Sequence, residues 1–204
     1  MGELNLLPAD AGNGLTTERL VLRRYTLDDL PDLIALNRDP DVMRYLGGPV
    51  DERTSEAMLR GRILQYYGDH PGLGVWATCL RGSGEIIGFH LLNHVQGETL
   101  IQVGYRLHRR HWGRGYATEM SMALLRYGYV RLGLSTLMAT ALPGNTASQH
   151  VLLKCGLHRA GERFFLHPAY APFGALAYFE RARAEWLAEF SPADLAAAPD
   201  GIPT

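Results

Sequence analysis

Apolar and polar positions along the chain predict alternating strands and helices. Residues 18–25 alternate apolar and charged side chains, which is typical of a half-exposed strand. Two aspartates then precede apolar residues at helical spacing, and a second helix is predicted over 51–67, behind a Gly-Gly-Pro turn. The further predicted elements are strands over 74–80, 85–92 and 99–107, a helix over 118–131, a strand over 134–142, a short helix over 146–155, and two longer strands in the remainder to residue 186.

This order of elements indicates the fold class. A meander of strands leads into a strand–helix–strand unit, which predicts an α/β fold built on a mixed sheet. No internal repeat or linker interrupts it, so we expect one domain over residues 15–190. Residues 1–14 and 191–204 are poor in structural signals, and we expect both termini to be flexible.

Composition narrows the class of protein. The 204 residues are 47% hydrophobic and 20% charged, with a formal net charge of −1, so no overall field favours nucleic acid or an anionic membrane. Cys79 and Cys155 lie far apart, which argues against a disulfide scaffold. The start of the chain lacks the features of a signal peptide, and no apolar run reaches about 18 residues. We expect a soluble, cytoplasmic protein.

The segment 105–119 carries the chemistry. It leaves a predicted strand, passes two glycines and three arginines, and enters a helix, whose unpaired N-terminal amides suit a phosphate. Gly113 and Gly115 let the backbone approach a ligand closely. A dinucleotide loop would have a third glycine where Thr118 stands, and the Lys of a Walker A loop is absent. The pattern alone leaves two interpretations open: a diphosphate site and a basic, solvated turn.

Two motifs carry a resemblance to a known family. Residues 112–119, Trp-Gly-Arg-Gly-Tyr-Ala-Thr-Glu, resemble the pyrophosphate loop of GNAT acetyltransferases, in the form found in the RimJ/RimL-type (ribosomal-protein-alanine N-acetyltransferase-like) branch. Residues 145–157 resemble the family segment whose Asn and Ser contact the pantetheine arm, although both residue types also cap helices well. Residues 17–23, 39–44, 84–88 and 181–187 are similar to the opening strand, the first helical connection, the third strand and the terminal strand of that branch.

The resemblance implies a fold and an activity. The fold would be that of GNAT acyl-CoA N-acyltransferases, a mostly antiparallel sheet that splays between strands four and five, placed here at 99–107 and 134–142, with acetyl-CoA in the gap. The activity would be direct acetyl transfer from acetyl-CoA to a primary amine, on a protein N-terminus or a small molecule. The implied cofactor-binding residues are Tyr105, Leu107, Arg109, Arg110, Trp112, Gly113, Arg114, Gly115, Tyr116, Ala117, Thr118, Asn145 and Ser148.

The catalytic groups are less well marked. Many relatives carry a Tyr where this chain has Leu152, so we expect Ser148 to protonate the leaving thiolate. Glu98 could accept the proton of the amine through water, and His167 is a second candidate because an imidazole titrates near neutral pH. His167 could equally be a turn residue beside Pro168. No metal is expected, and the sequence leaves monomer and dimer open.

Two other functions stay in view. The chain lacks the Tyr of the helix, and it has Gln102, which cannot take a proton, where the fourth strand could carry a carboxylate; both features would also suit a catalytically silent acyl-CoA-binding sensor or scaffold. A nucleotide-binding protein could use the same loop for another diphosphate, but the segment 145–157 would then be unexplained.

Overall fold

The computed structural model describes residues 15–190, so the expected flexibility of residues 1–14 and 191–204 lies outside the described part. Seven strands form one sheet in the order β1-β2-β3-β4-β5-β7-β6. Their bounds are β1 Leu20–Arg24, β2 Gly74–Leu80, β3 Ile86–His94, β4 Ile101–Leu107, β5 Thr136–Ala141, β6 His158–Arg163 and β7 Leu176–Ala182.

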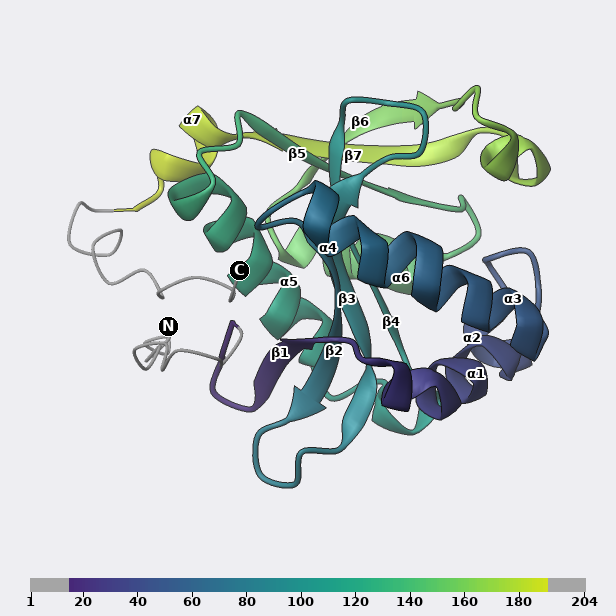
Figure 1. Cartoon of the computed structure of the whole chain (residues 1–204). Helices are drawn as coiled ribbons and strands as arrows, with labels where there is room; N and C mark the ends of the chain where they lie inside the picture. The colour runs from purple at the N-terminus through teal and green to yellow at the C-terminus, as the bar shows by residue number, and fades with distance from the viewer. Residues whose placement is uncertain (1–14, 191–204) are drawn as a thin grey trace.

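The sheet is mixed and opens between β4 and β5. Every neighbouring pair is antiparallel except β4 and β5, which are parallel and share the single register pair Gln102↔Met138. Figure 1 shows β5, β6 and β7 running across the top of the view, at a steep angle to β2, β3 and β4. The α/β fold with a mostly antiparallel sheet that opens between its fourth and fifth strands, expected from the sequence, is confirmed.

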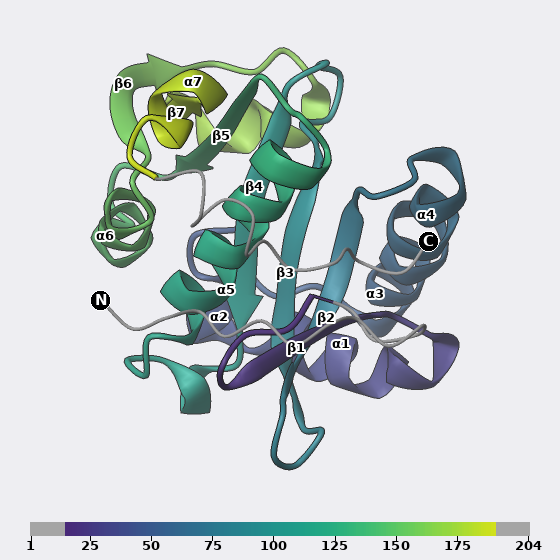
Figure 2. The ribbon, with the colours of Figure 1, turned by 90° about the vertical axis from the view of Figure 1, so that its left-hand side faces the viewer.

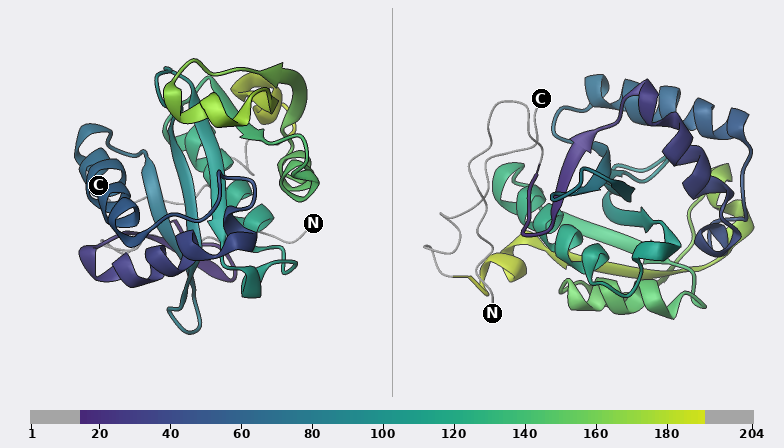
Figure 3. Two further views of the ribbon diagram at one scale, coloured as in Figure 1. Left: turned by 90° about the vertical axis from the view of Figure 1, so that its right-hand side faces the viewer. Right: turned by 90° about the horizontal axis from the view of Figure 1, so that it is seen from below.

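Helices cover both faces of the sheet. One face carries α5 and α6, and the other carries α1 to α4 (Figures 2 and 3). The helices are α1 Leu30–Arg38, α2 Pro40–Met43, α3 Glu52–Ala57, α4 Gln65–Asp69, α5 Tyr116–Arg126, α6 Thr146–Lys154 and α7 Arg183–Leu187. A π-helical segment, Met58–Leu64, joins α3 to α4, and another, Tyr127–Arg131, extends α5. Within residues 15–190 no helix is long and apolar enough to cross a membrane.

The double cover explains the hydrophobic pattern of the central strands. In β2 every residue from Gly74 to Cys79 is buried, because helices lie over both sides of that strand. The main core also takes in the inner face of α5, through Met120 and Leu124, and Tyr129 just beyond it. A second, smaller cluster around Met138 and Tyr178 lies beside the opening.

One expected element is wrong. Residues 181–187 were expected to form the terminal strand, but β7 ends at Ala182 and Arg183–Leu187 form α7. Trp186 explains the change, because its ring packs 5.3 Å from that of Tyr129 and 4.3 Å from that of Phe190. Phe190 lies in the turn after α7, where its amide donates to the Leu187 carbonyl, and this turn brings its ring back to Trp186, whereas a strand would not place residues four apart in such contact.

Candidate functional site

The loop between β4 and α5 has the backbone that an anion site requires. Gly113 has φ of 72° and Gly115, the residue before α5, has φ of 80°, a region that favours glycine. No side chain of the capping residue satisfies the first amides of α5. A Cβ built on Gly113 would meet no heavy atom within 4 Å, so the space over the loop is open. These features fit a diphosphate group bound at the start of α5.

Trp112 fixes the loop to the strand before it. Its indole Nε1 donates to the carbonyl oxygen of Leu107 at 2.8 Å, while 48% of the side chain stays exposed. The carbonyl of Leu107 is therefore already bonded, and Trp112 positions the loop through the last residue of β4.

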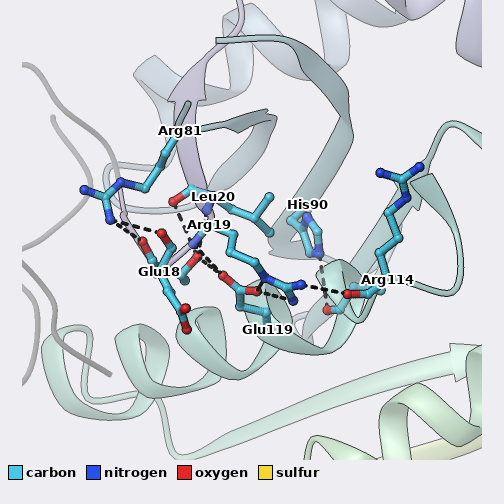
Figure 4. A network of polar contacts seen from close by, with 9 residues as sticks. Glu18, Arg19, Leu20, Arg81, His90, Arg114 and Glu119 are labelled. Carbon is cyan, nitrogen blue, oxygen red and sulfur yellow. Dashed lines mark hydrogen bonds and ion pairs between the residues drawn. The ribbon is translucent and has the colours of Figure 1, made fainter. Parts of the chain in front are cut away.

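Glu119 fixes the first turn of α5 to the region of β1. Its carboxylate accepts from the Thr17 hydroxyl at 2.6 Å, from the Arg19 amide at 3.0 Å and from Arg19 Nε at 2.6 Å. Arg19 also donates to the carbonyl of Arg114 at 3.0 Å and lies over the ring of Tyr116 (Figure 4). The Glu of the loop motif is thus a positioning residue, a role that the sequence did not indicate.

The three arginines expected at the anion have different surroundings. Arg109 pairs with Asp41, and Arg110 pairs with Glu85 at 3.0 Å. The Arg110 contact also holds the pKa of Glu85 below its usual value. The guanidinium of Arg114 makes no ion pair within residues 15–190, and Figure 4 shows it pointing away from the Glu119 network. Arg114 is therefore the arginine of this loop that keeps its charge free for a ligand.

The backbone of β4 is open toward β5. The His108 amide donates to the Ile87 carbonyl on β3 at 2.9 Å. Backbone groups alternate in direction along a strand, so those of Tyr105 and Leu107 point away from β3 and toward β5. Beyond Gln102↔Met138 no register pair joins β4 to β5. The backbone at Tyr105 can therefore bond a ligand that lies along the opening.

The start of α6 lies across this opening. Asn145 caps the helix, since its Oδ1 accepts from the Ser148 amide at 3.2 Å. Burial raises the pKa of the Tyr105 phenol, and the Ser148 side chain lies near enough to that phenol to oppose the rise. Cys155 at the end of α6 donates to the carbonyl of Thr118 in α5. Ser148, Tyr105 and the loop therefore lie together.

Two buried groups near the opening are not free to react. Burial raises the pKa of Cys155 to about 12, so its thiol is inert as a nucleophile. His90 on β3 lies 2.7 Å from the Thr78 hydroxyl and 3.4 Å from the carbonyl of Ala117. Burial lowers the pKa of His90 to about 3, so this imidazole is neutral and positions the first turn of α5.

Glu98 and His167 lie apart from Ser148. The turn between β3 and β4 holds Glu98, which pairs with Arg163 at 3.5 Å, and the neighbouring Gly97 packs on His167. This turn is at the other end of β4 from the glycine loop. His167 Nδ1 accepts from the Ala169 amide at 3.2 Å, so in the neutral ring the proton is on Nε2. The structure brings Glu98 and His167 together, but not to Ser148.

A carboxylate that the sequence did not indicate lies nearer the opening. Glu180 on β7 is in register with Met138, which is in register with Gln102, so the three residues form one row across the sheet. Tyr178 donates to Glu180 at 2.7 Å. No sequence motif marks this pair, because only strand register brings it to the opening. Within the described residues no group of three His, Cys, Asp or Glu side chains could hold a metal ion.

The chain belongs to the GNAT acetyltransferase family. The family model described as Acetyltransferase (GNAT) domain matches residues 19–158. YkkB of Bacillus subtilis (strain 168) is 33% identical over 152 residues, which cover 73% of this chain and 87% of YkkB. The uncharacterized N-acetyltransferase YoaA of the same organism is 30% identical over 169 residues, which cover 80% of this chain and 94% of YoaA.

Solved structures share the fold. An acetyltransferase from Agrobacterium tumefaciens has a TM-score of 0.71 at 27% identity, covering 86% of this chain and 96% of that chain. RimL, a ribosomal alpha-N-protein acetyltransferase in complex with coenzyme A, has a TM-score of 0.67 at 15% identity, covering 83% of this chain and 97% of RimL. At family level the protein is an acetyl-CoA-dependent N-acetyltransferase.

Proposed function

We propose that this protein transfers an acetyl group from acetyl-CoA directly to a primary amine, of a protein N-terminus or a small molecule, as a member of the RimJ/RimL-type branch. One observation carries the proposal: an uncapped helix start behind Gly113 and Gly115 lies beside a sheet that opens after the pair Gln102↔Met138. The first feature suits a diphosphate and the second suits an extended arm with amide groups, and coenzyme A contains both.

The residues that would hold the cofactor divide by the part they contact. The amides around Gly115, Tyr116 and Ala117, with the free Arg114 guanidinium, would bind the pyrophosphate. The backbone at Tyr105 and the side-chain amide of Asn145 would form hydrogen bonds with the pantetheine arm from the two sides of the opening. Arg109 and Arg110 would add positive electrostatic potential near the pyrophosphate rather than contact it, because each is already paired with a carboxylate. Trp112 and Thr118 would shape the loop and the first turn of α5.

Ser148 is the proposed proton donor to the leaving thiolate. It stands at the start of α6 with the Tyr105 phenol close by, and we propose that this phenol returns a proton to the serine hydroxyl. The amine would lose its proton through water toward Glu98 or His167; His167 packs on Gly97, next to Glu98, at the end of β4 away from the glycine loop. Cys155 takes no part, so the transfer needs no covalent enzyme intermediate.

Release of the free thiol of coenzyme A over a panel of primary amines tests the proposal. We expect turnover with at least one amine, and a Ser148→Ala variant with lower kcat but an unchanged KM for acetyl-CoA. Glu98→Gln and Glu180→Gln, compared through pH–rate profiles, separate the proposed base from the carboxylate nearer the opening. Tight acetyl-CoA binding without turnover on any amine would instead favour the silent sensor or scaffold.

A further inference from the structure

Arg106 has an unusual environment for an arginine of this protein. Side chains alternate along β4, so Arg106 points to the face opposite Tyr105, toward α1. There its Nη1 donates to Asn37 Oδ1, and its guanidinium lies 5.0 Å from the centre of the Phe89 ring. The Nε group is buried and has no hydrogen-bond partner.

No carboxylate within residues 15–190 forms an ion pair with Arg106. The buried Arg181, by contrast, forms an ion pair with Glu189. Burial lowers the pKa of Arg106 to about 10, although Tyr25 opposes this in part, and the charge of Arg62 adds a smaller lowering. A buried guanidinium without a counter-charge is costly, so this site favours an anion.

A second cation strengthens the same site. Arg62 comes from the π-helical segment between α3 and α4, and the Gln96 amide lies against its guanidinium. Loss of solvent lowers the pKa of Arg62, and the Tyr170 phenol opposes that effect in part. Two guanidinium groups from different elements therefore act on one region, and no carboxylate in the described part of the chain forms an ion pair with either.

The position of Arg106 relates this region to the reaction. Arg106 lies between Tyr105 and Leu107, the residues whose backbone faces the opening. Farther along the same face of β4 there is a hollow of about 450 Å³ lined by Asp39, His108, Arg109 and Arg110. A group bound at Arg106 would thus be held on the side of the strand opposite Ser148, where an acceptor can approach.

We propose that Arg106, supported by Arg62, binds a carboxylate of the acceptor, so that the acceptor is a small molecule with a primary amine and a carboxylate, such as an amino acid. This inference rests on the proposed acetyltransferase function. With Nη1 bonded to Asn37 and Nε enclosed, Nη2 is the group of the Arg106 guanidinium that can donate a charge-assisted hydrogen bond to a carboxylate.

The test compares L-amino acids with the corresponding amino-acid amides, which keep the amine but lack the negative charge. At saturating acetyl-CoA, we expect kcat/KM for the preferred acid to exceed that for its amide by about 10- to 100-fold, the range of a charge-assisted hydrogen bond. Arg106→Gln should remove this preference by raising KM for the acid, with KM for acetyl-CoA unchanged. Arg106→Lys should restore it in part, because lysine keeps the charge but does not place its donor where the guanidinium does.

Arg60→Gln is the matched control. Arg60 lies two residues before Arg62, is exposed and pairs with Glu56, so its loss should leave the preference intact, while Arg62→Gln should reduce it. Equal kcat/KM for acid and amide in the unmodified protein overturns the proposal, even if Arg106→Gln fails to fold. So does turnover confined to peptides with blocked C-termini. Absence of acetyl-CoA binding would instead refute the proposed function itself.

Discussion

His90 provides a quantitative test of the site's architecture. It is fully buried between β2 and α5, where Thr78 Oγ1 and the carbonyl of Ala117 contact its two nitrogens. The Ala117 carbonyl can only accept, so Nε2 carries the proton and Nδ1 accepts from the Thr78 hydroxyl. A second proton would go to Nδ1, and the Thr78 hydroxyl could turn to accept from it, but the ring would then carry a charge in a place that water does not reach.

The size of the effect follows from the lowered pKa. In the folded protein His90 stays neutral down to about pH 3, whereas in the unfolded chain it takes up a proton below about pH 6.5. Its contribution to stability is therefore complete above pH 6.5 and is lost as the pH falls toward 3. Between pH 7 and pH 5 the loss is about 2 kcal/mol.

Urea unfolding at pH 7 and pH 5, on the natural protein and on His90→Gln, isolates this contribution. Glutamine can accept from Thr78 and donate to Ala117 but does not titrate, so the variant should lose about 2 kcal/mol less between the two pH values. At pH 7 we expect it to be less stable by about 1 kcal/mol, because its hydrogen bonds fit less well. An equal pH dependence in both proteins would refute the buried, neutral His90 beneath the loop.

Three further predictions concern the loop and α6. Glu119→Gln removes the charged acceptor of Thr17 and Arg19 and should lower the free energy of unfolding by about 2 kcal/mol in urea titrations; no change would contradict the positioning role. Gly115→Ala should cost about 1 kcal/mol, because φ is positive there, and should weaken acetyl-CoA binding measured by calorimetry; unchanged affinity would count against the loop. Cys155→Ala should retain turnover, and the native Cys155 thiol should resist iodoacetamide, as followed by mass spectrometry.

Local pattern was sufficient for most of the fold. The strands expected over 74–80 and 99–107 correspond to β2 and β4, because alternation and burial depend on neighbouring residues. The expected strand over 181–187 failed since Trp186 packs against Tyr129, a residue more than fifty positions away in the sequence. Long-range packing of this kind leaves no trace in a short window of sequence.

The residues of the candidate site also fall into those with a local sequence signature and those that depend on long-range contacts. Gly113, Gly115 and Asn145 could be found because backbone geometry and helix capping leave local signatures. The environment of Arg106 could not be predicted, since it depends on Asn37 and Phe89 lying beside it and on no acid being there. The row of Gln102, Met138 and Glu180 across the sheet could not be predicted either, because only the register of the strands creates it.

Calorimetric titration of the protein with acetyl-CoA, beside ATP and NAD, tests the central claim most directly. The loop, the open backbone of β4 and the start of α6 together match a diphosphate with an amide-containing arm, so we expect micromolar binding of acetyl-CoA and far weaker binding of the two nucleotides. Equal binding of all three would mean that only the diphosphate is recognised and that the opening between β4 and β5 holds no pantetheine. Absence of acetyl-CoA binding would contradict the account.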